Sequence, residues 1–197
     1  MFKKLLSSLA KNPWKSYAAS IGAEYIDGGF HSDRIIVTRQ EVTVVVTVGT
    51  NQRGNSGFRY TRFRCSYTSD QSPYFSIKTK TFYSFKGLFS KKKQNSLPIQ
   101  NLYDISIQKE ELFSLLSDDH QFCMHLDALS AFKYTSEKDD GEYGPVFLPT
   151  EHQLCLELLG EIEEAPLLAA GIGIIFATVD LYRNHGLLSA EKSTVCY

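Results

Sequence analysis

The sequence has 197 residues, the length of one ordinary domain, and is 43% hydrophobic and 22% charged. Such a composition can fill a sizeable core, and it excludes a disordered tail, a collagenous repeat and a coiled coil. The formal net charge is −1, an average that by itself argues against a polyanionic partner. We expect a single domain over residues 1–197, with an ordered core at about 14–188.

The charge is unevenly distributed along the chain. Residues 53–93 carry ten basic side chains and one acid, whereas residues 98–164 carry fifteen acids and three lysines. The positions of charges, and not only their sum, set the electric field around a protein. The sequence therefore predicts two segments of opposite charge, which either neutralise each other across the fold or face different partners.

The N-terminal residues, the longest apolar stretch and the cysteines indicate where in the cell the protein is expected. The first ten residues start with charge, but two serines interrupt their apolar run and Lys11 stops it, so they do not fit a secretory signal peptide. Residues 165–179 are apolar over about 15 positions, fewer than the roughly 20 that span a bilayer, and predict a buried helix. Four scattered cysteines without a C-x-x-C pair favour reduced thiols. We expect a cytoplasmic protein without a transmembrane segment.

In chain order, the pattern predicts a helix, about six strands, a helix, two strands and a helix. The helices are expected at 14–21, around 112–116 behind Glu110 and Glu111, and at 166–185. Runs rich in Val, Ile, Thr and aromatic residues predict strands at 25–30, 34–38, 42–48, 58–68, 74–85, 103–107, 132–135 and 152–162. The polar run at 49–57 predicts a long hairpin tip.

Strands that are segregated from helices indicate an α+β fold and not a doubly wound one. Short connections between the early strands favour antiparallel pairing. We therefore expect a mainly antiparallel sheet of about seven or eight strands, strongly bent or forming a partly open barrel, with an N-terminal, a middle and a C-terminal helix.

Three stretches carry a family resemblance. They are the tryptophan-bearing residues 14–29, Tyr-Thr-Arg-Phe-Arg at 60–64, and Tyr-Asp-Ile-Ser-Ile-Gln-Lys-Glu-Glu-Leu at 103–112. Together they resemble an uncharacterised bacterial family of domains of unknown function, in which a tryptophan helix, a Tyr-Thr-Arg strand and a Phe-Asp segment before a helix follow one another. Tyr103 stands here in place of that phenylalanine. The resemblance covers most of residues 14–188 and implies a fold, without catalytic residues.

The basic segment is also rich in aromatic residues, ten of which lie between Phe58 and Phe89. Guanidinium groups supply paired donors and aromatic rings supply stacking, a combination that suits an anionic partner. The candidate ligand-binding residues are Arg59, Arg62, Arg64, Lys78 and Lys80. The alternative is ordinary sheet packing, with aromatic cross-strand pairs and with the charges in solvent or paired with the acidic half.

Two weaker patterns bear on other kinds of site. Residues 91–93 are three lysines that follow Phe85 and Phe89, as in a tip that touches a membrane, but so few lysines attach weakly and a solvated loop is favoured. The local group of potential metal ligands is Asp118, Asp119, His120, Cys123 and His125. Its spacing matches no structural zinc site, so we expect no metal.

No sequence motif for a catalytic nucleophile, a phosphate-binding loop or a zinc protease is present, and Gly171 and Gly173 lie inside an apolar helix. We expect no cofactor and no catalytic residues, so the first hypothesis is a non-enzymatic binding module that engages an acidic protein or an anionic membrane. Nucleic acid is disfavoured because the acidic segment would repel its phosphates. The alternatives are a small enzyme whose site assembles only in the fold, and an electrostatic homodimer.

Overall fold

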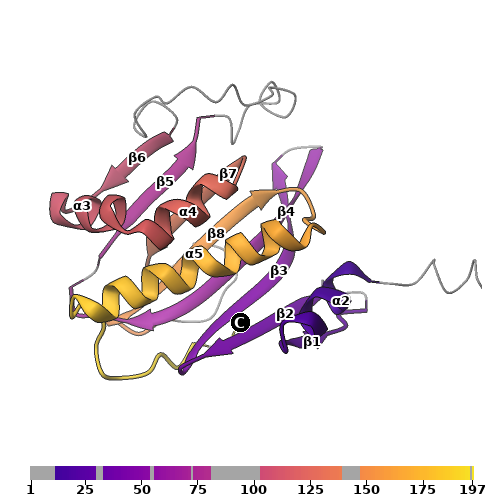
Figure 1. Cartoon of the computed structure of the whole chain (residues 1–197), viewed down its shortest axis with the longest axis horizontal. Helices are drawn as coiled ribbons and strands as arrows, with labels where there is room; N and C mark the ends of the chain where they lie inside the picture. Colours follow the sequence, from indigo (N-terminus) through magenta and orange to yellow (C-terminus); the bar gives the residue numbers. More distant parts are fainter. Residues whose placement is uncertain are drawn as a thin grey trace, which may run out of the picture.

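A computed structural model describes residues 12–29, 33–53, 56–71, 73–80, 103–138, 147–195 and 197. In this part of the chain, four helices pack on an open, eight-stranded antiparallel sheet (Figure 1). The predicted α+β fold with a mainly antiparallel sheet of about seven or eight strands is thereby confirmed. The predicted order of elements is confirmed as well, except that two short helices replace the single middle one.

The helices are α2 (Pro13–Ser20), α3 (Glu110–Asp118), α4 (His120–Ala128) and α5 (Ala165–Asn184). The strands are β1 (Glu24–Ile26), β2 (Arg34–Arg39), β3 (Val42–Arg53), β4 (Ser56–Thr68), β5 (Phe75–Thr79), β6 (Tyr103–Ile107), β7 (Phe132–Glu137) and β8 (Glu151–Leu159). In the sheet they lie in the order β1-β2-β3-β4-β8-β7-β5-β6, with every neighbouring pair antiparallel. β1 and β6 are the two edges, so the sheet does not close into a barrel.

The N-terminal helix α2 is capped and anchored as its sequence indicates. The side-chain oxygen of Asn12 accepts hydrogen bonds from the backbone N–H groups of Trp14 at 2.9 Å and Lys15 at 3.2 Å, and Pro13 occupies the first turn. The buried indole of Trp14 donates to the carbonyl oxygen of Ile162 at 2.7 Å. This bond fastens α2 to the segment that precedes α5.

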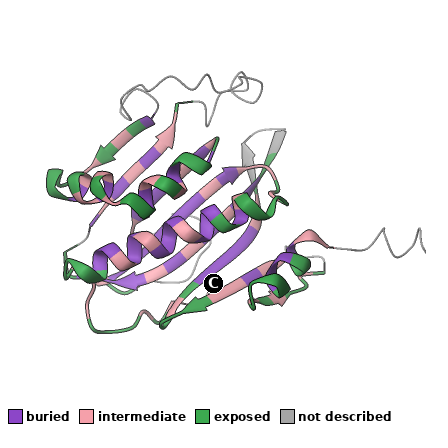
Figure 2. Ribbon diagram, viewed as in Figure 1, coloured by how far each residue is buried: buried purple, intermediate pink, exposed green. Residues whose placement is uncertain are grey.

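Helix α5 lies across one face of the sheet, and buried residues follow it and the strands beneath it (Figure 2). Two glycines bring it close to its neighbours. A Cβ at Gly171 would lie 2.5 Å from the ring of Phe63 on β4, and a Cβ at Gly173 would lie 2.4 Å from the ring of His125 on α4. The buried side chains of the strands and helices form one continuous cluster.

The helix predicted at 166–185 is α5 (Ala165–Asn184), and the apolar stretch within it is largely buried. By length and composition alone it passes as a candidate membrane span, as core helices of soluble proteins also do, and 61% of that window is buried inside the structure. The absence of a transmembrane segment therefore stays a prediction.

The polar run at 49–57, predicted as a hairpin tip, lies between the paired strands β3 and β4. Both strands extend into it, with Asn51 opposite Phe58 and Arg53 opposite Ser56. Ladder hydrogen bonds join backbone groups and need no apolar side chains, so the hairpin extends past the core. Residues 81–85 of the predicted strand at 74–85, and the three lysines at 91–93, lie outside the described residues.

The predicted middle helix is divided by Asp119. The carboxylate Oδ1 of Asp119 accepts a hydrogen bond from the backbone N–H of Phe122 at 2.6 Å and so caps α4. The thiol of Cys123 donates to the carbonyl oxygen of Ser117 at 3.3 Å. Burial lowers the pKa of His125, whose ring packs over Gly173. Asp119 and Cys123 thus make contacts at the junction of α3 and α4, whereas His125 packs against α5.

Candidate functional site

Three of the five candidate basic residues form ion pairs with acids of the same chain. The pairs are Arg62–Glu157 at 2.8 Å, Arg59–Glu161 at 2.6 Å and Lys78–Asp104 at 3.8 Å. All three acids belong to the acidic segment 98–164. Neutralisation within the chain, which the sequence leaves open as an alternative, is thus realised at these three positions.

Strand order explains the pairing. β4 lies beside β8, and β5 beside β6, so each basic strand adjoins a strand from the acidic segment. In the register, Arg62 is directly opposite Glu157 and Lys78 is directly opposite Asp104. Opposite charges facing each other across an antiparallel pair stabilise it by roughly 0.2–1 kcal/mol when exposed.

The Arg62–Glu157 pair is the most enclosed of the three, with side chains 12% and 18% exposed. The guanidinium donates to Glu157 Oε1 from Nε at 3.1 Å and from Nη2 at 2.8 Å, and Nη2 also donates to the hydroxyl of Tyr60 at 2.9 Å. Burial alone would lower the pKa of Arg62, but the neighbouring Cys155 sulfur and the Glu157 carboxylate outweigh burial and raise it. Arg62 is a fixed structural charge.

The other two candidates lie in different surroundings. The guanidinium carbon of Arg64 lies 4.4 Å above the ring centroid of Tyr197. Lys80 is exposed, at one end of a hollow beside β6. Three of the five residues are thus paired with acids, and an acidic protein or an anionic membrane as their common partner stays a prediction.

A cleft opens where β3 and β4 diverge. The two strands are paired from Val45 and Arg64 outward to the hairpin end, but the start of β3 continues only beside β2, and the end of β4 continues only beside β8. The space between them has a volume of about 730 Å³ and is lined by both strands, the end of α5 and the C-terminal segment. Figure 1 shows the start of β3 and the end of β4 spread apart.

The C-terminal segment, residues 189–197, runs along the diverging end of β4 in the direction opposite to the strand. Its polar contacts to the sheet are Ser189 N to Thr68 O at 2.9 Å, Thr68 Oγ1 to Glu191 O, Ser66 Oγ to Val195 O at 3.4 Å, Arg34 Nη1 to Tyr197 O at 3.1 Å and Tyr197 Oη to Gln153 Oε1 at 3.1 Å. An ion pair of 2.8 Å between Lys192 and Glu41 ties the segment to the β2–β3 turn. The segment is thus bound to three strands and one turn.

Glu151, at the start of β8, is the central acceptor for this segment. One carboxylate oxygen accepts from the Thr194 backbone N–H at 2.6 Å, the Thr194 hydroxyl at 2.9 Å and the Ser193 hydroxyl at 3.1 Å, and the other accepts from Leu148 N at 2.8 Å. Glu151 is only 1% exposed. Burial acts to raise its pKa, but the hydrogen bonds from Leu148, Thr194 and Ser193 outweigh burial and lower it.

The C-terminal segment is expected to loosen in acid. The pKa of Glu151 is lowered from its ordinary value of 4.5, so the ionised carboxylate stabilises the folded state above that value, and this stabilisation is lost as the pH falls through the lowered pKa. In ¹⁵N NMR spectra, the Thr194 amide resonance should shift upfield as the pH falls below 4.5 and its acceptor is protonated. Glu151→Gln should remove this titration, and a Thr194 amide that titrates identically in both proteins would contradict the assignment.

Acid–base and nucleophilic groups in the core are occupied by hydrogen bonds. His152 is fully buried, with Nε2 2.8 Å from the Ser69 carbonyl oxygen and Nδ1 3.2 Å from the Tyr74 hydroxyl. The carbonyl accepts only, so Nε2 carries the proton and Nδ1 accepts from Tyr74. Burial raises the pKa of the Cys65 thiol to about 12, which leaves it protonated at neutral pH. No group of three potential metal ligands occurs among the described residues.

Sequence reasoning missed Glu151 and the C-terminal segment. Glu151 is one of fifteen acids in its region, and its main partner Thr194 is 43 positions further along the chain. The only local signal is a run of small and polar residues, Ser-Ala-Glu-Lys-Ser-Thr at 189–194, after the expected helix end. Such a run is typical of a solvated tail, so the pattern does not predict binding.

Comparison of the chain with protein-family models, with curated proteins and with solved structures finds no match. The resemblance to a bacterial family and the cytoplasmic location therefore stay predictions.

Proposed function

We propose that the protein is a non-enzymatic binding module that holds a short polypeptide segment of a partner protein along the diverging end of β4. The supporting observation is that this surface already binds a polypeptide, residues 189–197, through hydrogen bonds with β2, β4 and β8. The bound segment forms one wall of the cleft of about 730 Å³, a volume in the range of ligand sites. The partner segment would take the place of the chain's own segment.

The surface that binds the C-terminal segment favours a particular chemistry at each end. Near Glu151, a carboxylate that accepts three hydrogen bonds from residues 193–194 favours hydroxyl side chains and backbone N–H donors. At the other end, Arg34 donates to the backbone carbonyl of Tyr197 and the guanidinium of Arg64 lies over its ring, so an aromatic residue is favoured there.

The chain's own segment must compete with any partner. A tethered segment acts at an effective concentration on the order of millimolar, so a free peptide binds the intact protein only weakly. Substitutions confined to the tethered segment should therefore free the surface beneath it without changing that surface.

The test is fluorescence anisotropy with a labelled peptide of residues 187–197, carrying serine in place of Cys196. The protein is the full chain with Ser193→Ala, Thr194→Val and Tyr197→Ala, which remove the side-chain contacts of the tether to Glu151, Gln153 and Arg64. We expect this variant to bind the peptide at least tenfold more tightly than the unmodified chain, because the competing tether is weakened.

The matched control is a peptide that carries Ser193→Ala and Thr194→Val, which should bind the triple variant about tenfold more weakly because two hydrogen bonds to a carboxylate are missing. Circular dichroism establishes that the variant is folded. A folded variant that binds neither peptide at concentrations on the order of millimolar would refute the proposed function.

A further inference from the structure

The edge strand β6 (Tyr103–Ile107) offers backbone groups for pairing. Among the described residues, β6 pairs only with β5. The backbone N–H of Gln108 donates to Tyr74 O at 3.3 Å, and alternation from this bond turns the backbone groups of Ser106 and Asp104 toward β5. The backbone groups of Tyr103, Ile105 and Ile107 therefore face away from the sheet. An edge of this kind is a template for another strand.

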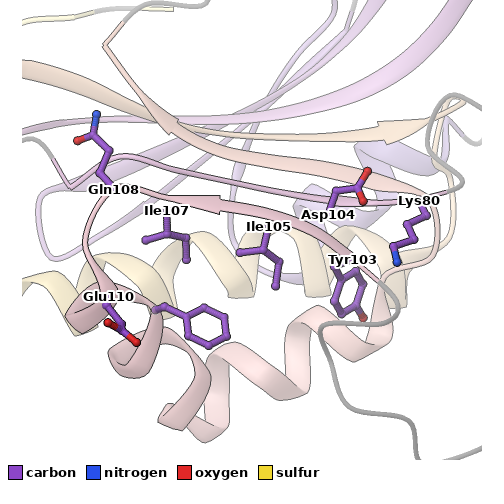
Figure 3. Close-up of a pocket in the computed structure, with 8 residues that line it drawn as sticks. Lys80, Tyr103, Asp104, Ile105, Ile107, Gln108 and Glu110 are labelled. Atoms are coloured by element: carbon purple, nitrogen blue, oxygen red, sulfur yellow. The ribbon is translucent and has the colours of Figure 1, made fainter.

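A hollow of about 700 Å³ lies beside this edge, between β6 and the helix α3 (Figure 3). Ile105 and Ile107 of β6 and Phe113 of α3 line it, and each is only partly buried. Half-buried apolar side chains next to unpaired backbone groups are the two features that an added strand uses for specificity and for affinity.

The two ends of the hollow carry opposite charges. Lys80 lies at the end where β6 begins, beside Tyr103, whereas Glu110 lies at the end where β6 leads into α3 (Figure 3). Both side chains belong to exposed residues. Only a partner with the reverse charge order meets both ends favourably, and a second copy rotated by a half-turn has that order.

A two-fold axis through Ile105 also satisfies the backbone. It sets Ile105 opposite Ile105 of the second copy, and Tyr103 opposite the second copy's Ile107. These three are the residues whose backbone groups face outward, so roughly six hydrogen bonds form, two for each facing pair. An axis through Asp104 or Ser106 would instead oppose residues whose backbone groups are already directed at β5.

We infer that two copies of this chain associate through antiparallel pairing of their β6 strands about Ile105, making one continuous sheet across a homodimer. The apolar contacts are Ile105 on Ile105 and Tyr103 on Ile107, on the face that carries α3. Lys80 of each copy lies against Glu110 of the other. This interface is separate from the cleft between β3 and β4.

The first test is light scattering of the full chain over a concentration series, with Ile105→Pro as the disrupting variant. Proline removes an N–H that faces away from β5, so the fold is expected to remain while the dimer weakens at least tenfold. A chain that is monomeric up to concentrations on the order of millimolar would overturn the inference, as would a dimer that Ile105→Pro leaves intact.

The second test needs no proline and uses charge exchange. Lys80→Glu or Glu110→Lys alone is expected to weaken the dimer about tenfold, because each dimer holds two such contacts, and the double variant should restore it. Lys15→Glu with Glu24→Lys, exposed residues near the opposite sheet edge, is the matched control and should leave dimerisation unchanged. Failure of the double variant to restore the dimer would overturn the proposed register.

Discussion

Replacing Phe63 by alanine is expected to lower the free energy of unfolding by about 3–5 kcal/mol, the range for a large aromatic side chain removed from a core. Phe63 is fully buried on β4 and lies opposite Val46 of β3 and Leu156 of β8. Its ring also fills the space left by the missing side chain of Gly171 on α5. The loss therefore affects the sheet and the helix layer together, and urea unfolding followed by circular dichroism measures it.

The contact between Phe63 and Gly171 also gives a control. The effect of Gly171→Ala on the free energy of unfolding should change sign when the Phe63 ring is removed. In the natural chain, Gly171→Ala places a Cβ 2.5 Å from the Phe63 ring, and this overpacking is expected to cost about 1–3 kcal/mol. In the Phe63→Ala background the ring is absent, and the same substitution should stabilise by roughly 1 kcal/mol through helix propensity and partial filling of the cavity. Equal effects of Gly171→Ala in both backgrounds would show that the ring and the glycine are not coupled.

The second large effect is expected at Glu157. Glu157→Ala removes the carboxylate that accepts two hydrogen bonds from the mostly enclosed guanidinium of Arg62, and we expect a loss of about 2–4 kcal/mol. Replacing both residues by apolar ones, as in Arg62→Met with Glu157→Leu, should recover most of that loss. Urea unfolding of Arg62→Met, Glu157→Leu and the double variant completes a double-mutant cycle.

Arg59 and Glu161 provide the matched comparison. Their side chains are 61% and 38% exposed, so water competes with the pair. Glu161→Ala is expected to cost no more than about 1 kcal/mol, in line with other surface pairs. If Glu157→Ala cost as little as Glu161→Ala, the Arg62 pair would be no more than a surface contact.

The fold was predictable where local chemistry decides it. Strand alternation, Pro13 and Pro166 at helix starts, and Gly22 and Gly186 at helix ends give element types and order. The neighbours of β4 were not predictable, because its contact from Arg62 to Glu157 spans 95 positions and depends on the whole sheet. Local patterns also do not predict that β3 and β4 stay paired through polar residues as far as Arg53 and Ser56.

The candidate site was less predictable than the fold. A count of charges identifies Arg62 and Lys78 but cannot reveal that Glu157 and Asp104 stand opposite them in register. Glu151 and Thr194 meet only because α5 returns the chain to the diverging end of β4. The sequence thus predicts which groups are charged, whereas strand order decides which remain available to a partner.

The late arrival of β8 affects the chain during synthesis. When synthesis has passed residue 93 but has not reached β8, β4 has no neighbour on the side that β8 later takes, and residues 1–93 carry sixteen basic residues and five acids. Unpaired strand edges on nascent chains invite aggregation, and like charge opposes it. Arg62 belongs to this positive charge until β8 places Glu157 opposite it.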